Sequence, residues 1–383
     1  MSALASRGRP RKRSFRDAAA LQRRPWPGVI EAYRRHLPVG KRTRVITLFE
    51  GNTPLIPAPR LAKWVGGGVR ILLKFEGMNP TGSFKDRGMT MAITRAVEEG
   101  SRAVVCASTG NTAASAAAYA ARAGLPCFIL IPRGAVALGK MAQSLMHNAK
   151  VLQVEGNFDA ALEVVRELGR LYAVNVVNSI NPFRIEGQKT GSFEICDALG
   201  RPPAFHALPV GNAGNITAYW KGYREYRDLK VTRSLPRMLG FQARGAAPIV
   251  LGHPVEDPRT IATAIKIGNP ASWKQAVAAR DESHGLIDTV TDEEILGAYR
   301  ALASEDGVFA EPASAASVAG VRKLARRGYF SGFRDRTVVC VLTGNGLKDP
   351  NTAVECFGRI GVVKPGLEDV VDALGLKGAR RKG

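Results

Sequence analysis

The chain has 383 residues, of which 45% are hydrophobic. This length and composition predict one large globular domain or two smaller ones. No apolar run approaches the roughly 20 residues that span a bilayer. Its five cysteines and five histidines lack the close spacings of a disulfide framework or a metal site. We therefore expect no bound metal and no membrane association and, because an apolar secretory signal is missing, a cytoplasmic protein with reduced thiols.

The net charge of +22 is concentrated at the two ends of the chain. Residues 1–45 carry a net charge of +11 and residues 377–383 add four positive charges, which leaves +7 for the body. We interpret residues 1–25 as a basic, disordered extension and residues 366–383 as a basic C-terminal tail. The extension is either a solvated arm, or a start codon assigned too early, or a segment that binds nucleic-acid phosphates. No recognition motif follows it, so nucleic acid is not the partner that we expect.

Short apolar, β-branched runs alternate with longer helical segments from about Val69 onward. This alternation predicts an α/β protein whose parallel sheets are built from βαβ units and covered by helices on both faces. The predicted strands are residues 69–75, 102–107, 126–131, 150–154, 173–177, 204–210, 237–242 and 336–342. The predicted helices include residues 86–99, 111–123, 158–172, 216–227, 292–304 and 313–326. Ligands bind such sheets at the carboxyl ends of the strands, where the motifs described next lie.

The first motif, residues 79–86, is a turn that contains Gly82 and ends at a predicted helix. Its lysine, Lys85, can be held out of solvent, where an ammonium group loses its proton more readily. A neutral lysine amine forms a Schiff base with a carbonyl cofactor. Most lysines in turns are solvated charges, so Lys85 becomes a catalytic candidate only together with a second element further along the chain.

The second motif, residues 108–112, follows the predicted strand that ends at Ala107. Its polar side chains converge on a helix N-terminus, an arrangement that suits a carboxylate or another oxyanion. These side chains are Ser108, Thr109, Asn111 and Thr112. Asn111 could also donate a hydrogen bond to a phenolate oxygen. Because Ser, Thr and Asn are the preferred helix N-caps, the residues alone leave a binding site and a helix cap equally open.

Residues 134–140 have much of the spacing of a nucleotide-binding P-loop. However, Met141 stands where a hydroxyl group must bind magnesium, and Ala, Val and Leu stand where backbone amides should face phosphate. Nucleotide hydrolysis is therefore not the predicted activity.

The third motif is the loop Gly211, Asn212, Ala213, Gly214 and Asn215, between a predicted strand and a predicted helix. Two glycines let the backbone approach an anion closely, and the positive end of the following helix favours phosphate. An ordinary turn of this kind usually needs one glycine, so the composition favours a phosphate-binding loop. A Schiff-base lysine combined with a phosphate-binding loop indicates pyridoxal 5'-phosphate, an aldehyde that carries a phosphate.

The fourth motif, residues 342–346, contains Thr343 at the carboxyl end of a predicted strand. A threonine there can bond a pyridine nitrogen without adding a full charge. Taken alone, the segment is typical of a glycine-rich turn.

These motifs together resemble the threonine synthases, a family of the tryptophan-synthase-β-like, fold type II pyridoxal-phosphate enzymes. The resemblance extends from about Trp26 to Val363 and is carried most specifically by residues 178–190 and 265–270. It implies two parallel-type α/β domains in a homodimer. The larger, cofactor-binding domain would comprise residues 26–89 and 179–365, and a smaller mobile domain residues 90–178.

The resemblance also implies the reaction. A threonine synthase is a pyridoxal-phosphate-dependent carbon–oxygen lyase that converts O-phospho-L-homoserine and water into L-threonine and phosphate, the last step of threonine biosynthesis, by γ-elimination followed by β-addition of water. The alternative on the same fold is a threonine or serine dehydratase. Arg184 argues against it, because threonine and serine carry no phosphate that an arginine would bind.

The site residues follow from the same resemblance. Lys85 would bind the cofactor and transfer protons, Asn111 would bond its ring oxygen, and Thr343 its ring nitrogen. The cofactor phosphate would be held by Gly211, Asn212, Ala213, Gly214 and Asn215. The substrate carboxylate would be bound by Ser108, Thr109 and Thr112, and the substrate phosphate by Asn178, Ser179 and Arg184.

Overall fold

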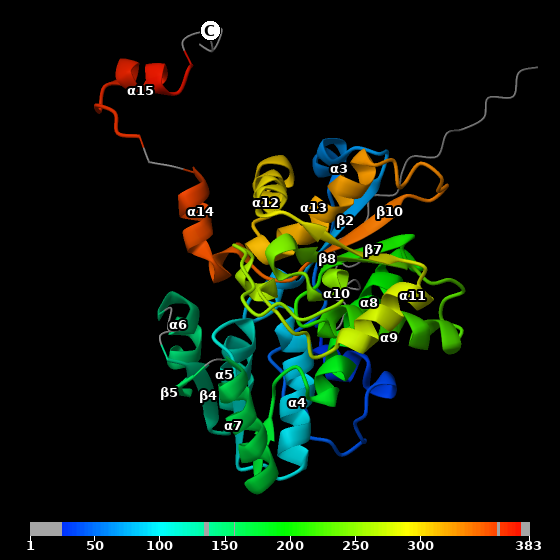
Figure 1. Ribbon diagram of the computed structural model, residues 1–383, viewed down its shortest axis with the longest axis vertical. Helices are drawn as coiled ribbons and strands as arrows, with labels where there is room; N and C mark the ends of the chain where they lie inside the picture. The colour runs from blue at the N-terminus through cyan, green and yellow to red at the C-terminus, as the bar shows by residue number, and fades with distance from the viewer. Residues whose placement is uncertain (1–24, 134–137, 157, 358–360, 377–383) are drawn as a thin grey trace, which may run out of the picture.

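The computed structural model describes residues 25–133, 138–156, 158–357 and 361–376. Most of the predicted basic extension, the last part of the basic tail and the first four residues of the P-loop-like segment lie outside these ranges. The described residues form a six-stranded sheet of order β1-β2-β10-β7-β8-β9 and a four-stranded sheet of order β5-β4-β3-β6 (Figure 1). Every neighbouring pair is parallel except β1 and β2. The predicted α/β class with parallel sheets is therefore confirmed, with β1 as an antiparallel addition.

The strands are β1 (Leu55–Pro57), β2 (Arg70–Phe75), β3 (Ala103–Ala107), β4 (Cys127–Pro132), β5 (Lys150–Val154), β6 (Val174–Val176), β7 (Phe205–Pro209), β8 (Arg237–Ala243), β9 (Leu286–Val290) and β10 (Thr337–Leu342). The α-helices are α2 (Val29–Ala32), α3 (Pro59–Val65), α4 (Lys85–Glu98), α5 (Asn111–Ala123), α6 (Leu138–Met146), α7 (Phe158–Leu171), α8 (Pro182–Leu199), α9 (Gly214–Asp228), α10 (Pro248–Leu251), α11 (Trp273–Glu282), α12 (Asp292–Asp306), α13 (Pro312–Arg326), α14 (Pro350–Phe357) and α15 (Leu367–Ala373). Short 3-10 helices are η1 (Arg34–His36), η2 (Glu76–Met78), η3 (Arg244–Ala246), η4 (Thr263–Ile265) and η5 (Gly346–Lys348).

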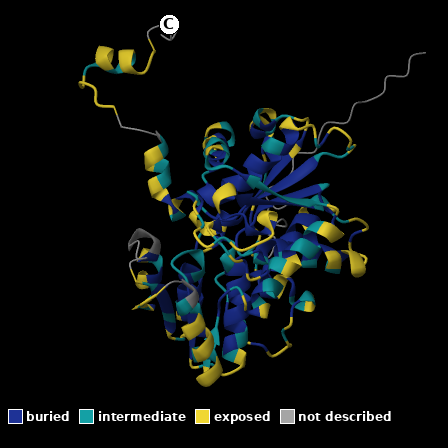
Figure 2. Ribbon diagram, in the orientation of Figure 1, coloured by how far each residue is buried: buried dark blue, intermediate teal, exposed yellow. Residues whose placement is uncertain are grey.

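Helices cover both faces of the six-stranded sheet. Alternate side chains of β2 enter different cores, since Leu73 packs with α3, α12 and α13 whereas Leu72 packs with α8, α9 and α11. This period-two alternation is what a strand buried on both faces requires. The strands at the centre of this sheet are accordingly buried, whereas exposed residues lie on the outer sides of helices and on loops (Figure 2).

The four-stranded sheet has the same three-layer arrangement. In β3, Val104 and Cys106 pack with α4, α5 and α6, whereas Val105 and Ala107 pack with α7. Each of the eight strands and six helices predicted from the sequence is present, with ends shifted by at most two residues. The strands β1 and β9 were not predicted. They are the two edge strands of the larger sheet, where a continuous apolar run is not required.

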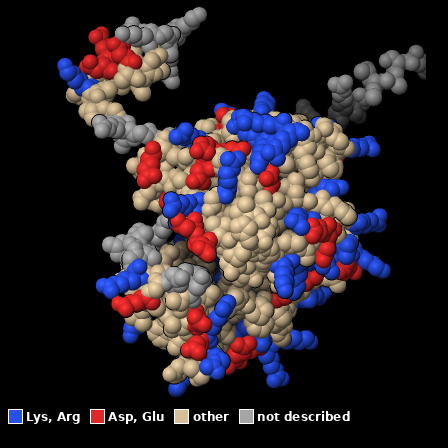
Figure 3. Space-filling view, viewed as in Figure 1, with Lys and Arg blue, Asp and Glu red and all other residues tan. Residues whose placement is uncertain are grey.

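Within the described residues, no helix is both long enough and apolar enough to cross a bilayer. Positive and negative side chains both occur across the face shown in Figure 3. The last helix, α15, stands away from the body of the protein (Figure 1), with Leu367 and Leu374 exposed.

Candidate active site

Three of the predicted motifs lie at one edge of the six-stranded sheet. The neighbouring strands β2, β10 and β7 are parallel, so the loops that follow their carboxyl ends are brought together. Lys85 directly follows the loop after β2, Thr343 lies in the loop after β10, and the segment Gly211–Asn215 follows β7 and includes the start of α9. A backbone hydrogen bond of 2.9 Å from the amide of Asn345 to the carbonyl oxygen of Gly82 ties the first two loops together.

Lys85 is the first residue of α4 and is partly buried. The next residue, Asp86, anchors this turn: it accepts hydrogen bonds from the amide and hydroxyl of Thr81, at 2.7 and 2.6 Å, and from the hydroxyl of Ser115 at 2.6 Å. Burial lowers the pKa of Lys85 to about 7, with a further lowering by the charge of Arg184 and an opposing effect of Glu311. A substantial fraction of the amine is therefore neutral near pH 7, the form that reacts with an aldehyde.

The carboxylate of Glu311 joins two of the predicted cofactor ligands. It accepts a hydrogen bond of 3.0 Å from the side-chain amide of Asn111 and one of 2.9 Å from the hydroxyl of Thr343. Asn111 belongs to the helix that begins after β3 of the smaller sheet, so the carboxyl ends of the two sheets face each other here. The sequence alone indicates no role for Glu311, because a single acidic residue before a helix forms no motif of its own.

The loop after β7 has the properties of an anion site. Ala213 adopts a left-handed conformation, with φ of 63°, directly before α9 begins at Gly214. Among the described residues, no acceptor takes a hydrogen bond from the backbone amides of this loop. Both polar atoms of the buried Asn215 side chain also lack a hydrogen-bond partner among the described residues. Unpaired donors at a helix N-terminus fit the phosphate of pyridoxal phosphate.

Gly211 has a second reason to be a glycine. A Cβ atom at this position would lie 2.9 Å from the Cα atom of Ile265, closer than packing permits. Asn212 anchors the loop through its side chain, which donates to the hydroxyl of Ser179 at 2.5 Å and accepts from the amide of Ala271 at 2.6 Å. The shape of the loop is thus maintained by neighbours distant in the sequence.

The loop after β3 leaves its helix N-terminus open. The hydroxyl of Ser108 accepts from the amide of Gly110 at 3.2 Å. Gly110 is the N-cap residue of α5, and within the described part of the chain this helix has no side-chain cap. Thr109 and Thr112 are partly buried beside it. The sequence left a helix cap and an oxyanion site equally open, and the uncapped helix end favours the oxyanion site.

Arg184 is a buried cation with unpaired donors. Its side chain is 1% exposed, and its Nη1 donates to the carbonyl oxygen of Val177 at 3.3 Å. Nε and Nη2 have no partner among the described residues. Burial lowers the pKa of this guanidinium to about 10. Because a buried charge without a partner is costly, the arrangement favours an anionic ligand at Arg184.

Asn178 is used differently from Arg184. Its side-chain amide donates to the carbonyl oxygen of Ala107 at 2.9 Å and accepts from the amide nitrogen of Ala107 at 3.0 Å. The side chain thus holds the carboxyl end of β3, and these two bonds occupy one donor and its acceptor oxygen. Of the three predicted ligands of the substrate phosphate, Arg184 is the one with buried donors that lack a partner in the described part of the chain.

A buried ionic network supports the first turn of α4. Arg87, which is 1% exposed, donates to the carboxylates of Glu76 and Glu194, each at a shortest distance of 2.6 Å. Lys74 also pairs with Glu194, at 2.7 Å. The partners lie far apart in the sequence, so no local pattern predicts the network.

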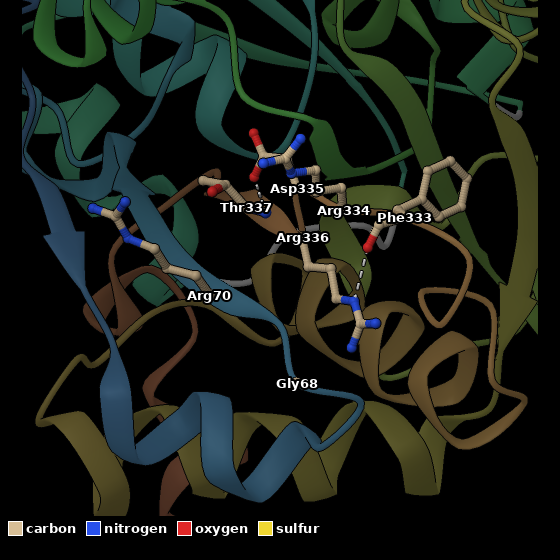
Figure 4. A pocket seen from close by; sticks show the side chains of 7 residues that line it. All are labelled: Gly68, Arg70, Phe333, Arg334, Asp335, Arg336 and Thr337. Carbon is tan, nitrogen blue, oxygen red and sulfur yellow. Dashed lines mark hydrogen bonds between the residues drawn. The ribbon is translucent and has the colours of Figure 1, made fainter.

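A surface hollow of about 440 Å³ lies at the opposite edge of the sheet, where β2 and β10 begin (Figure 4). It is lined by Gly68, Arg70, Phe333, Arg334, Asp335, Arg336 and Thr337. Arg336 donates to the backbone carbonyl oxygens of Phe333, Gly67 and Ser331, and Asp335 pairs with Arg201. These side chains stabilise loops, and no motif predicted from the sequence lies there.

The comparisons with known proteins agree with this geometry. Residues 46–344 match the family described as pyridoxal-phosphate dependent enzyme. The chain is 60% identical over 353 residues to a threonine synthase of Mycobacterium leprae, covering 92% of this chain and 97% of that one. It is 61% identical over 330 residues to a threonine synthase of Halalkalibacterium halodurans, covering 86% and 92%. The structure of maize serine racemase is similar in fold, with a TM-score of 0.70 at 20% identity, over 85% of this chain and 96% of that one.

Proposed function

The chain belongs to the pyridoxal-phosphate-dependent enzymes and, within them, to the threonine synthases, and from this we propose how its residues convert O-phospho-L-homoserine and water into L-threonine and phosphate. It is a lyase of fold type II that uses pyridoxal phosphate. The observation that supports the substrate best is Arg184, a buried guanidinium outside the phosphate loop after β7. Two of its donors have no partner among the described residues, and its charge lowers the pKa of Lys85. A phosphorylated substrate needs such a second anion site.

The bound cofactor supplies an electron sink for the negative charge that develops next to the substrate amino group. Lys85 is the group that holds the cofactor and, once released from it, takes the α-proton and returns protons later in the reaction. Its lowered pKa supports this role, because the amine must be neutral to accept a proton near pH 7.

Two anion sites orient the substrate. The open N-terminus of α5, with Ser108, Thr109 and Thr112, binds the carboxylate. Arg184 binds the phosphate and stabilises it as it leaves. Ser179, whose hydroxyl accepts a hydrogen bond from the side chain of Asn212, is a second ligand of this phosphate. Asn178 contributes by holding the carboxyl end of β3 in place.

The other contacts to the cofactor come from the loop after β7, from Asn111 and from Thr343. The cofactor phosphate is held by the backbone amides of Gly211, Asn212, Ala213, Gly214 and Asn215, which have no acceptor among the residues that the structure describes. Asn111 bonds the ring oxygen and Thr343 the ring nitrogen. Both side chains point to one carboxylate, that of Glu311, which supports a shared site between them.

We further propose that residues 90–178 move as a unit relative to residues 26–89 and 179–365, and that closure keeps water away from the early steps. The strands of the four-stranded sheet all lie within residues 90–178, which supports this division. A homodimer and a cytoplasmic location are also proposed. The location is supported by five free cysteines, four of them buried.

A direct assay separates this function from its rival. Purified enzyme with cofactor is given O-phospho-L-homoserine, and phosphate and threonine are measured, while ketoacid formation is measured from threonine and serine. We expect phosphate and threonine in equal amounts and little ketoacid. Ketoacid from threonine without phosphate release would instead identify a dehydratase. Removal of residues 1–24 is expected to leave the activity intact; if it does not, the lesser alternative of nucleic-acid binding through the basic ends must be tested.

A further inference from the structure

A chain of three buried side chains ends next to the proposed position of the cofactor ring. The amide of Gly344 donates to the hydroxyl of Ser314 at 3.1 Å, and this hydroxyl lies 2.9 Å from that of Thr343. The hydroxyl of Thr343 in turn lies 2.9 Å from Oε1 of Glu311. All three side chains are at most 5% exposed. Water therefore does not compete for these bonds, and the chain has few alternative arrangements.

The direction of this chain depends on the proton of Glu311. A hydroxyl group has one proton to donate. When Glu311 is a carboxylate, it can only accept, so Thr343 donates to it and presents lone pairs to any other neighbour. When Glu311 is protonated, it can donate to Thr343, and the threonine proton is free to point elsewhere.

Several groups face Glu311 and govern its charge. The cations are Lys85 from α4 and Lys348 from η5, and the neutral donors are Asn111 and Thr343. Burial is the largest influence and raises the pKa of Glu311, whereas these cations and donors lower it. Lys348 itself also bonds the carbonyl oxygen of Thr81 at 3.1 Å and Gln143 at 2.6 Å, and its charge is balanced in part by Asp86. Burial and the neighbouring groups thus act on the charge of Glu311 in opposite directions, with burial as the largest influence.

We propose that Glu311 is a positioning residue that acts through Thr343: its protonation decides whether the threonine hydroxyl offers a donor or an acceptor to the ring nitrogen of the cofactor. The inference rests on the proposed function, because it needs the ring nitrogen to face Thr343. A donor hydroxyl leaves the nitrogen unprotonated, and an acceptor hydroxyl favours a protonated nitrogen. The carboxyl group of Glu311 thereby sets how strongly the bound cofactor withdraws electrons.

The test is a pH titration of the visible absorbance of the purified enzyme with bound cofactor and without substrate. The wild-type enzyme should show an acid-side step, which reports the protonation of Glu311. Glu311→Gln, which has a similar shape but does not titrate, should lose this step while keeping the cofactor. Its kcat should fall by about 10- to 100-fold, the effect of losing a hydrogen bond to a charged group, with KM changed by less than about threefold.

Two Thr343 variants and one control variant keep the test decisive. Thr343→Val removes the hydroxyl and should also lose the step, whereas Thr343→Ser keeps the hydroxyl and should retain it. Glu355→Gln, the same replacement at an exposed position of α14, is the matched control and should titrate like the wild type. If Glu311→Gln does not retain cofactor, the Thr343 variants decide. A step that persists in Thr343→Val, or in a cofactor-loaded Glu311→Gln, would overturn the proposal, as would a wild-type enzyme without the step.

The outcome is independent of the substrate assignment. A protein that shows the predicted titration but releases no phosphate from O-phospho-L-homoserine would contradict the proposed function and leave the role of Glu311 standing. A protein that releases phosphate but shows the same titration in all variants would support the proposed function and contradict the role of Glu311.

Discussion

The backbone amide of Phe84 donates a hydrogen bond of 3.0 Å to the carbonyl oxygen of Thr343. The bond joins the residue before Lys85 to the residue that follows β10. The backbone segments that position the amine of Lys85 and the hydroxyl of Thr343 are therefore linked directly. Neither side chain takes part in the bond. Replacements of Lys85 and Thr343 therefore test chemistry more than folding.

Lys85→Ala should abolish turnover and the visible absorbance of lysine-bound cofactor, because it removes the amine whose pKa is lowered to about 7 and which forms the Schiff base. Absorbance spectra and borohydride reduction followed by peptide mapping check this. Lys63→Ala, at an exposed position of α3, is the control and should label like the wild type. A Lys85→Ala enzyme with full activity would refute the central assignment.

Arg184→Ala should raise KM for O-phospho-L-homoserine strongly, by about 10- to 100-fold, while cofactor stays bound, because a charged hydrogen-bond partner of the substrate phosphate is lost. Steady-state kinetics and the absorbance of bound cofactor measure the two effects separately. Arg184→Lys, which keeps the charge but not the planar group, should fall between the wild type and the alanine variant. Unchanged kinetics in Arg184→Ala would exclude a role in substrate binding.

The rate at which the cofactor-free protein captures pyridoxal phosphate should rise with pH through about 7 and then level off. The ammonium of Lys85 must lose its proton before it can attack, and its pKa is lowered to about 7 by burial and by Arg184. Stopped-flow absorbance from roughly pH 6 to 8 measures this rate.

The neighbours of Lys85 should move the midpoint of that profile in opposite directions. Arg184→Ala removes a positive charge and should raise the midpoint, whereas Glu311→Gln removes a carboxylate and should lower it. A profile that is flat over this range, or a midpoint that ignores both changes, would contradict the assignment of the titrating group to Lys85.

Arg87→Met should lower the free energy of unfolding by about 3–5 kcal/mol, because Glu76 and Glu194 would lose a buried partner. Urea unfolding followed by circular dichroism measures the change. Arg224→Ala, which breaks an exposed pair with Glu282, is the control and should leave the unfolding midpoint almost unchanged. Equal midpoints in the two variants would show that the buried network does not stabilise the fold.

Most of the fold could be predicted from the sequence, because strands and helices buried on both sides carry their own patterns. The helix predicted at residues 111–123 is α5, with the same ends. The strand β9 was not predicted: it contains Asp288, is half-buried along most of its length and lies at the edge of the sheet. A strand of that kind needs no apolar run, so its sequence resembles that of a loop.

Local sequence thus determined the α/β class and the strand-end loops that contain Lys85, Asn111, Gly211 and Thr343, because turn chemistry and periodicity depend on neighbouring residues. Only the tertiary structure decided which charges meet. Residues from separate elements meet where Glu311 contacts Asn111 and Thr343, and again in the network around Arg87. Packing also buries Arg184 with donors that have no partner among the described residues. The pairing of buried charges depends on how those elements pack, and spacing along the chain carries no record of it.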